Sequence, residues 1–115
     1  MEDPTDIRPW GSFKVLHDSR QFKVKILEVL PGKKLSYQRH KKRSERWTVV
    51  SGEATVIIDG IEKVHLEGDV ILIDIGSKHR LINNTDRPVI VVEVQMGKYF
   101  GEDDIERFED DYGRI

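Results

Sequence analysis

The stretch that decides the fold of this 115-residue chain reads GKKLSYQRHKKRSERWTVVSG over residues 32–52. A second stretch reads GDVILIDIGSKHRLIN over residues 68–83. Each contains short segments with the composition of β-strands, which are Leu35–His40, Arg46–Val50 and Val70–Ile75. Glycine and polar residues bound these segments, as is typical of strands that end in turns. Both stretches are therefore predicted to consist of paired strands.

The same pattern continues on both sides of these stretches. Phe22–Leu30 alternates apolar and polar residues in its first half, which indicates a strand. Ala54–Ile58 runs into Asp59-Gly60, a strong hairpin signal, and Ile61–Leu66 follows as the returning strand. Further strands are expected at residues 10–16, 79–82 and 89–95. Because turn signals recur roughly every eight to twelve residues, we predict an all-β sandwich or barrel.

The two ends of the chain differ from this pattern. Residues 1–9 are mostly polar and contain two prolines, so we expect a flexible N-terminal arm followed by one domain over residues 10–115. Near the other end, Gly101–Phe108 is predicted to form a short helix. Its early acidic residues favour the first turn of a helix through the helix dipole.

Composition limits the classes of partner. Charged residues make up 35% of the chain, and the net charge of −2 predicts no general affinity for nucleic acid or membrane. The chain contains no cysteine, no apolar run long enough to span a membrane, and no apolar signal-peptide core. These features predict a soluble cytoplasmic protein. The charge is uneven: residues 33–46 carry seven Lys or Arg and one acid, whereas residues 102–111 carry seven acids and one arginine.

Four polar residues are candidate metal ligands. Gln38 and His40 are two residues apart, so both can point to one face of a strand. Glu45 begins the next strand, and His79 begins a later one. Two imidazoles, a carboxylate and an amide oxygen suit one divalent ion, with Zn²⁺ first and Fe²⁺, Co²⁺, Mn²⁺ or Ni²⁺ as alternatives. A lone histidine is more often a surface or core residue than a ligand, so spacing alone leaves both interpretations open.

The spacing of these residues matches known motifs. Residues 32–52 match the first cupin motif, with Gln38 in the first histidine position, and residues 68–83 match the second, with Asp74 where proline is usual. The match extends well beyond these motifs. The additional matching segments are Arg8–Ser12, Leu35–Gln38, Arg43–Glu45, Trp47, Val49–Gly52, Lys78–Leu81, Glu93–Gln95, Tyr99–Ile105 and Asp110–Arg114. Over residues 8–114 the chain resembles the type II mannose-6-phosphate isomerase family.

The resemblance implies a cupin-type double-stranded β-helix, or jelly-roll barrel, with one bound divalent metal ion. It also implies a homodimer and the interconversion of mannose 6-phosphate and fructose 6-phosphate. In many members of this family the domain is the C-terminal half of a bifunctional enzyme that begins with a mannose-1-phosphate guanylyltransferase. A guanylyltransferase does not fit into 115 residues, so a stand-alone isomerase is expected. The chain departs from the family at Lys41, Lys42 and Arg46, where histidine is common.

Two acids are candidates for the proton transfer, which moves a proton between C2 and C1 through a cis-enediol. Glu45 is a candidate proton shuttle as well as a ligand, and Glu93 is the second candidate. Ile90, Val92 and Val94 form an all-apolar strand face that is expected to pack in the core. Glu93, on the other face, is then predicted to face either solvent or the mouth of a polar cavity.

The phosphate of the substrate requires cationic partners. We predict Arg8, Arg43 and Arg80, because a guanidinium group matches phosphate oxygens. Tyr99 either closes over the sugar or packs as an ordinary aromatic residue. Two other functions stay open: a non-catalytic sugar-phosphate or nucleotide-sugar binding module that partners a separate guanylyltransferase, and another metal cupin enzyme such as a dioxygenase. Gln38 as a ligand disfavours the dioxygenase.

Overall fold

The computed structural model describes residues 5–114, which form β-strands and no helix. In chain order the strands are β1 (Thr5–Arg8), β2 (Gly11–Asp18), β3 (Phe22–Val29), β4 (Tyr37–Arg39), β5 (Arg43–Ser51), β6 (Ala54–Ile58), β7 (Ile61–His65), β8 (Val70–Ile73), β9 (His79–Ile82), β10 (Val89–Gly97) and β11 (Glu106–Glu109). The all-β prediction is confirmed. The described part of the chain contains no helix that is long and apolar enough to cross a membrane.

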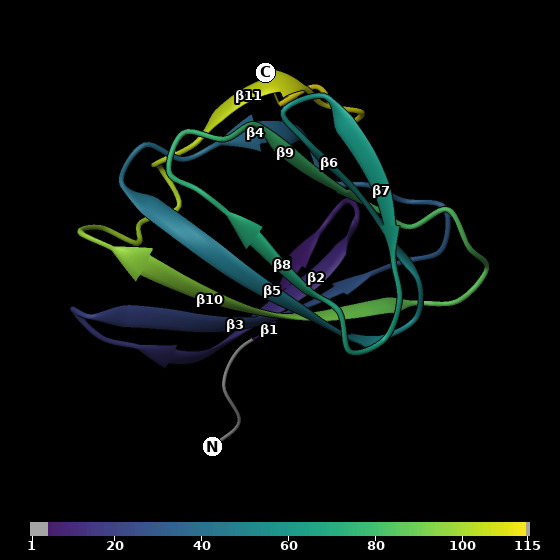
Figure 1. The fold of residues 1–115 in the computed structure, drawn as a ribbon, viewed down its shortest axis with the longest axis horizontal. Helices are drawn as coiled ribbons and strands as arrows, with labels where there is room; N and C mark the ends of the chain where they lie inside the picture. Colours follow the sequence, from purple (N-terminus) through teal and green to yellow (C-terminus); the bar gives the residue numbers. More distant parts are fainter. Residues whose placement is uncertain (1–4, 115) are drawn as a thin grey trace.

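The strands form two antiparallel sheets that face each other (Figure 1). One sheet has six strands in the order β1-β2-β3-β10-β5-β8, and the other has five in the order β11-β4-β9-β6-β7. Strand β10 lies between β3 and β5, so strands far apart in the sequence are neighbours in space. This interleaving of early and late strands is the arrangement of a jelly roll.

The inner face of the larger sheet changes from apolar to charged along its length. On β10 the inward residues Val89 and Val91 are followed by Glu93 and then Gln95, and all four side chains are buried. The neighbouring strand β3 changes at the same level. Glu93 pairs with Lys25 of β3, whereas Val91 pairs with an apolar residue of that strand. One end of the space between the sheets is therefore a hydrophobic core, and the other end is lined by polar side chains.

The hydrophobic core fills the apolar end. Its buried residues come from both sheets and from the segments that enter β2 and β4. They are Trp10, Phe13, Leu27, Val29, Leu35, Trp47, Val49, Ala54, Val56, Ile71, Ile73, Leu81, Val89 and Val91. The prediction that Ile90, Val92 and Val94 pack in the core is wrong, because these residues are only half-buried on the outside of the sheet. The inward face was not recognised because it carries the charged residue Glu93.

The hairpin between β6 and β7 is formed as the sequence predicted. Asp59 and Gly60 both have positive φ angles, of 48° and 84°, which a two-residue turn of the favoured hairpin type requires. Ala54 pairs with His65 and Ile58 with Ile61 across this hairpin. The turn residues thus fix the register of the two strands.

The helix predicted at Gly101–Phe108 is wrong, because this segment leads into strand β11. Glu106 of β11, the edge strand of the smaller sheet, pairs with Arg39 of β4, and their side chains form an ion pair of 2.7 Å. The carboxylate of Asp104 accepts hydrogen bonds from the backbone N–H groups of Lys41 and Lys42, both at 3.0 Å. The acids that favoured a helical turn are used instead as partners for the basic segment, and these tertiary contacts outweigh local propensity.

The N-terminal arm also differs from its prediction. Thr5–Arg8 pairs with β2 as strand β1, with Arg8 opposite Gly11. The first four residues of the predicted arm lie outside the described part of the chain. Because β1 is fixed to the larger sheet, it positions Arg8 beside the polar end of the molecule.

Candidate metal centre and its cavity

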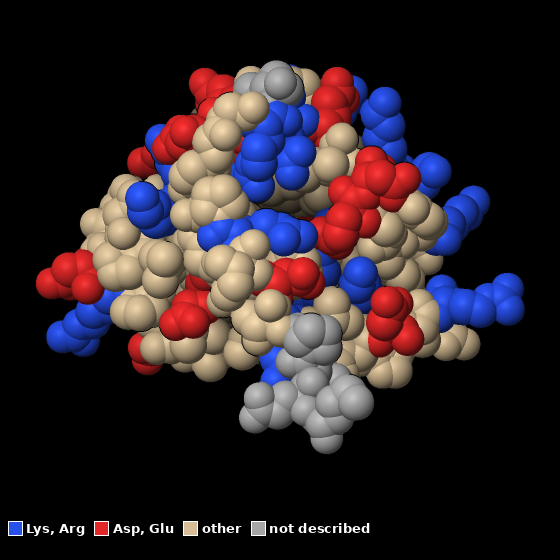
Figure 2. All heavy atoms as spheres, turned by 180° about the vertical axis from the view of Figure 1, so that it is seen from behind, with Lys and Arg blue, Asp and Glu red and all other residues tan. Residues whose placement is uncertain are grey.

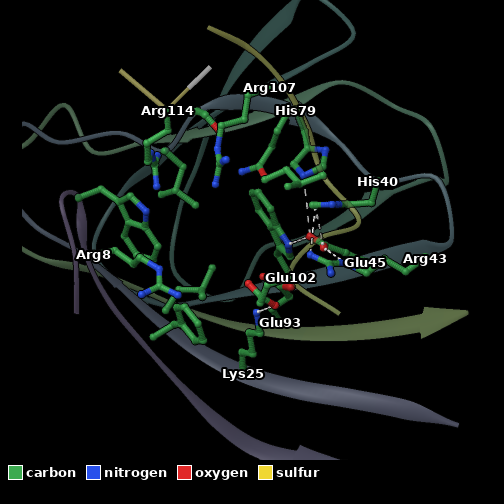
Figure 3. A pocket seen from close by; sticks show the side chains of 18 residues that line it. Arg8, Lys25, His40, Arg43, Glu45, His79, Glu93, Glu102, Arg107 and Arg114 are labelled. Atoms are coloured by element: carbon green, nitrogen blue, oxygen red, sulfur yellow. Dashed lines mark hydrogen bonds and ion pairs between the residues drawn. The ribbon is translucent and has the colours of Figure 1, made fainter. Parts of the chain in front are cut away.

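A cavity opens at the polar end, between the two sheets. The cavity has a volume of about 80 Å³, which is smaller than the ~300–1,000 Å³ of most small-molecule sites. Basic side chains gather around a recess on one face of the molecule, with acidic side chains beside them (Figure 2). Figure 3 shows the side chains that line the cavity, which come from both sheets and from the C-terminal segment.

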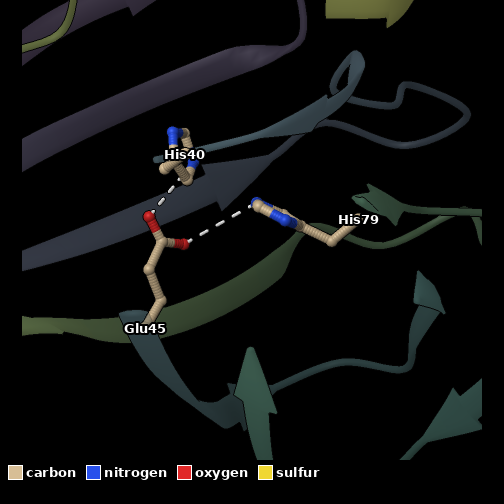
Figure 4. A group of neighbouring side chains, drawn as sticks. All are labelled: His40, Glu45 and His79. Atoms are coloured by element: carbon tan, nitrogen blue, oxygen red, sulfur yellow. Dashed lines mark ion pairs between the residues drawn. The ribbon is translucent and has the colours of Figure 1, made fainter. Parts of the chain in front are cut away.

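Three of the predicted ligands meet in this cavity. His40, Glu45 and His79 each offer a donor atom, and these atoms all lie within 4.8 Å of one another (Figure 4). All three residues are buried. A carboxylate oxygen of Glu45 is 3.3 Å from Nε2 of His40, and the other is 3.9 Å from Nε2 of His79. Two neighbouring segments that carry His40 and Glu45, and a distant one that carries His79, thus direct two imidazoles and a carboxylate at one point.

The backbone orients both imidazole rings. Nδ1 of His40 lies 2.7 Å from the carbonyl oxygen of Asp104, and Nδ1 of His79 lies 3.0 Å from that of Ser77. A carbonyl only accepts hydrogen bonds, so each Nδ1 carries a proton and each Nε2 is turned toward Glu45 as the ring atom available to a metal. Burial also lowers the pKa of His40, which favours its neutral form. Neutral rings fixed in this way are the form in which histidine binds a metal.

Glu45 is held as a carboxylate. Its oxygens accept hydrogen bonds from Nε of Arg43 at 2.8 Å and from Nε1 of Trp47 at 3.0 Å. Burial alone would raise the pKa of Glu45, but His40 and His79 in their protonated forms, together with the charge and hydrogen bond of Arg43, outweigh burial and lower the pKa to about 2. The group therefore stays ionised at neutral pH, as a metal ligand must.

The donor set fits a divalent ion. Bonds of about 2.0–2.2 Å to a common ion place ligand atoms roughly 3–4.4 Å apart, so small side-chain shifts close this cluster on an ion. Gln38 lines the same cavity, and β4 places it directly opposite His79 on β9. The His–Glu–His cluster could therefore hold a metal ion. The amide oxygen of Gln38 as a fourth ligand, and the identity of the ion, stay predictions.

The second carboxyl group of the cavity has the opposite environment. Glu93 lies on the inward face of β10 and is 5% exposed. Of the two orientations predicted from the sequence, solvent or a cavity, the structure has the one toward the cavity. Burial raises the pKa of Glu93 to about 8, and the nearby charge of Glu45 adds to this effect. Lys25 and Arg43 act in the other direction but do not cancel it. Gln95 donates a hydrogen bond to the Glu93 carboxyl group.

The predicted phosphate-binding residues divide into two groups. Arg8 and Arg43 line the cavity. Arg80 does not, because its guanidinium group donates to the carbonyl oxygen of Leu35 at 2.6 Å and pairs with Asp111 at 3.3 Å. Tyr99 also lies outside the cavity lining, since its hydroxyl donates to Asp103. Strand alternation explains this position, because Arg80 follows His79 on β9 and its side chain therefore points to the opposite face of the sheet.

Four charged residues of the cavity were missed by the sequence analysis. Lys25, Glu102, Arg107 and Arg114 all line it. Lys25 and Glu102 form an ion pair of 2.6 Å within this lining. A signal for Lys25 was present, because it continues the inward alternation that runs back from Val29. No such signal marked Arg107, because its segment was expected to be helical.

The jelly roll and the His–Glu–His cluster define a cupin with a candidate metal centre. Residues 3–110 match the family model described as "Mannose-6-phosphate isomerase C-terminal". The alginate biosynthesis protein AlgA of Pseudomonas aeruginosa is 48% identical over 107 residues, which cover 93% of this chain and 22% of that protein. The mannose-1-phosphate guanylyltransferase ManC of Salmonella typhimurium is 43% identical over 108 residues, covering 94% and 22%. This chain belongs to the mannose-6-phosphate isomerase C-terminal family, and it spans about a fifth of the length of these relatives.

Solved structures support the fold. An uncharacterized conserved protein with a double-stranded β-helix domain from Klebsiella pneumoniae has a TM-score of 0.74 and 26% identity, covering 84% of this chain and 83% of that one. A sugar phosphate isomerase from a cupin superfamily, from Silicibacter pomeroyi, has a TM-score of 0.75 and 19% identity, covering 98% and 92%. The second likeness shows the fold alone. The cupin prediction is thereby confirmed.

Proposed function

We propose that this chain is a metal-dependent aldose–ketose isomerase that interconverts mannose 6-phosphate and fructose 6-phosphate. One observation carries the proposal: a single cavity holds two carboxyl groups with opposite pKa shifts, Glu45 at about 2 and Glu93 at about 8. Such a pair can take two different roles, because one carboxyl group stays ionised while the other exchanges a proton near neutral pH. Membership of the family supports the choice of substrate.

Glu93 is the proposed proton shuttle. In its ionised form its carboxylate takes the proton from C2 of open-chain mannose 6-phosphate, which leaves a cis-enediolate with its negative charge on O1. The carboxylic acid so formed returns the proton to C1 while the proton of the C2 hydroxyl passes to O1, which gives the ketose and restores the carboxylate. A group whose pKa lies close to the working pH suits both halves of this transfer. Glu45 is the weaker candidate, because its carboxylate is occupied by Arg43 and Trp47.

The remaining side chains would bind and orient the sugar. A divalent ion held by Gln38, His40, Glu45 and His79 would stabilise the negative charge that develops on O1 and O2. Nη1 of Arg43 is buried and has no hydrogen-bond partner among the described residues. That N–H group is free to donate to a sugar oxygen beside the cluster, and it would help to orient the substrate.

A coupled spectrophotometric assay with mannose 6-phosphate tests the proposal. We expect turnover that a chelator removes and that Zn²⁺, Co²⁺, Mn²⁺, Fe²⁺ or Ni²⁺ restores. We also expect that Glu93→Gln loses at least about 100-fold in kcat, as general acid–base catalysis requires, while the binding of mannose 6-phosphate persists. A folded protein with no turnover on any of these ions would overturn the proposed activity.

A second candidate function is a non-catalytic module that binds a sugar phosphate or nucleotide sugar and partners a separate guanylyltransferase. The observation in its favour is the 43% identity to a protein named mannose-1-phosphate guanylyltransferase, of which this chain covers only 22%. Co-purification with such an enzyme, together with binding but no turnover by this chain alone, would favour the second candidate.

A further inference from the structure

Besides Arg43, three arginines line the cavity, one from the N-terminal part of the chain and two from its C-terminal part. Arg8 comes from β1, Arg107 from β11, and Arg114 from the segment that follows β11. Figure 3 shows Arg8 and Arg114 on one side of the cavity and the histidine cluster on the other. Bringing like charges together is unfavourable unless an anion joins them, so this convergence needs a physical reason.

Arg107 is the least satisfied of the three. Its Nε is buried and has no hydrogen-bond partner among the described residues. Burial lowers the pKa of Arg107, and the neighbouring charges of Arg114 and Arg8 act in the same direction, whereas Asp110 partly offsets them. Leaving a buried donor unpaired costs about 1–3 kcal/mol, more for a charged group. An anion in the cavity would supply the missing acceptor.

The position of Arg114 is fixed by a fully buried carboxylate. Asp110 accepts hydrogen bonds from Nε and Nη2 of Arg114 at 2.9 and 2.8 Å. Arg8 is likewise held in place, because its guanidinium group stacks over Phe13 at 4.9 Å. Three guanidinium groups and one carboxylate leave two positive charges, which match the nearly dianionic state of a phosphate monoester at neutral pH.

We propose that Arg8, Arg107 and Arg114 form an anion site that takes the phosphate of the substrate at the end of the cavity away from the His–Glu–His cluster. The identity of this substrate rests on the function proposed above. The two sites set the direction of the sugar, with its reacting carbons at the cluster and its phosphate at the far end. The preferred class is therefore an open-chain sugar whose phosphate is remote from the carbonyl, rather than one phosphorylated next to it.

Calorimetric titration of the full, chelator-treated chain tests the site without any need for turnover. The probes are inorganic phosphate and mannose 6-phosphate, and the variants are Arg107→Gln and Arg8→Gln. We expect each variant to raise both dissociation constants at least tenfold. Arg107→Lys should recover part of the loss because it keeps the charge but not the planar fork. Arg20→Gln removes an exposed arginine outside the cavity lining and serves as the matched control.

The outcomes separate this site from the proposed activity. Dissociation constants in Arg107→Gln and Arg8→Gln that equal those of Arg20→Gln would overturn the anion site, even in a chain that turns substrate over. Binding that depends on both arginines, in a chain that shows no turnover with any ion, would support the site and overturn the isomerase. If Arg107→Gln fails to fold, Arg8→Gln decides the result, because Arg8 is half-exposed on a different strand.

Discussion

At the scale of single residues, the cavity gives two glutamates different chemistry by surrounding them differently. Glu45 has an arginine and an indole N–H on its oxygens, and the lowered pKa keeps it ionised. Among the described residues, Glu93 has only an amide partner within hydrogen-bonding distance, and burial keeps Glu93 protonated up to about pH 8. The consequence reaches beyond catalysis, because a shifted pKa also makes folding stability depend on pH.

Glu93 is expected to destabilise the metal-free protein as pH rises. Its folded pKa, about 8, lies above the unfolded value of 4.5, so its contribution is favourable below pH 4.5 and is lost as pH rises through 8. Glu93→Gln should therefore gain roughly 1–4 kcal/mol relative to the unchanged chain between pH 5 and 9. Urea unfolding at a series of pH values measures this difference. A difference that stays constant with pH would show that burial does not raise the pKa of Glu93.

His79→Ala should lose both the metal ion and turnover, because it removes one of three donors that meet within 4.8 Å. Metal content by plasma mass spectrometry and the coupled assay measure the two losses. His65→Ala is the matched control, since His65 lies on β7 and pairs with Asp69 at 3.5 Å outside the cavity. Unchanged metal content in His79→Ala would remove this residue from the ligand set.

At the scale of elements, the C-terminal segment clamps the connection between β4 and β5. Asp104 accepts the two backbone N–H groups of Lys41 and Lys42 through its side chain and orients His40 through its carbonyl oxygen. Asp104 thus holds the connection between β4 and β5, on which His40 lies, without contributing a donor atom to the His–Glu–His cluster. Loss of the clamp should loosen His40 although the histidine itself is intact.

Asp104→Ala is predicted to weaken metal affinity roughly tenfold, as removal of a residue that orients a ligand commonly does. Competition with a chromophoric chelator measures the affinity. Asp103→Ala is the control, because the neighbouring Asp103 bonds to the exposed Tyr99 and not to the clamp. Equal affinities in the two variants would show that the side chain of Asp104 does not position His40.

Local sequence rules predicted most strands but not the elements set by tertiary pairing. The Asp59-Gly60 hairpin and the alternation in β3 carry their own signals, so both could be predicted. β11 could not, because its strand state comes from pairing with β4 and from ion pairs such as Arg39 with Glu106. The candidate ligands were predicted from spacing, whereas Arg107 was missed together with its strand.

At the scale of the whole molecule, the sandwich is divided along the strands rather than between the sheets. On β3 and β10 the inward residues become charged at the same level, where Lys25 pairs with Glu93, and β5 becomes charged at the next inward position, where Glu45 pairs with Gln95. The apolar half stabilises the fold and the charged half forms the cavity. The core and the cavity therefore lie at different ends of the same strands. This division lets a domain of 13.4 kDa carry a buried charged site without giving up its core.

The outer surface still carries apolar side chains, and we propose that a second copy of the chain covers those of β8. Val70 and Leu72 are 55% and 57% exposed on this strand, which pairs only with β5 among the described residues. An open edge with exposed apolar residues favours association with another copy. Sedimentation equilibrium should therefore give about twice the chain mass, and Leu72→Glu should give a monomer.

The control for the dimer is Ile7→Glu at the opposite edge of the same sheet, where Ile7 on β1 is 75% exposed. Both substitutions bury no charge in the monomer, so a change in mass reports the interface and not misfolding. A monomer in Ile7→Glu but not in Leu72→Glu would move the interface to β1, next to Arg8 and the cavity mouth. In that case dimerisation and phosphate binding would be coupled, and phosphate should stabilise the dimer by mass action.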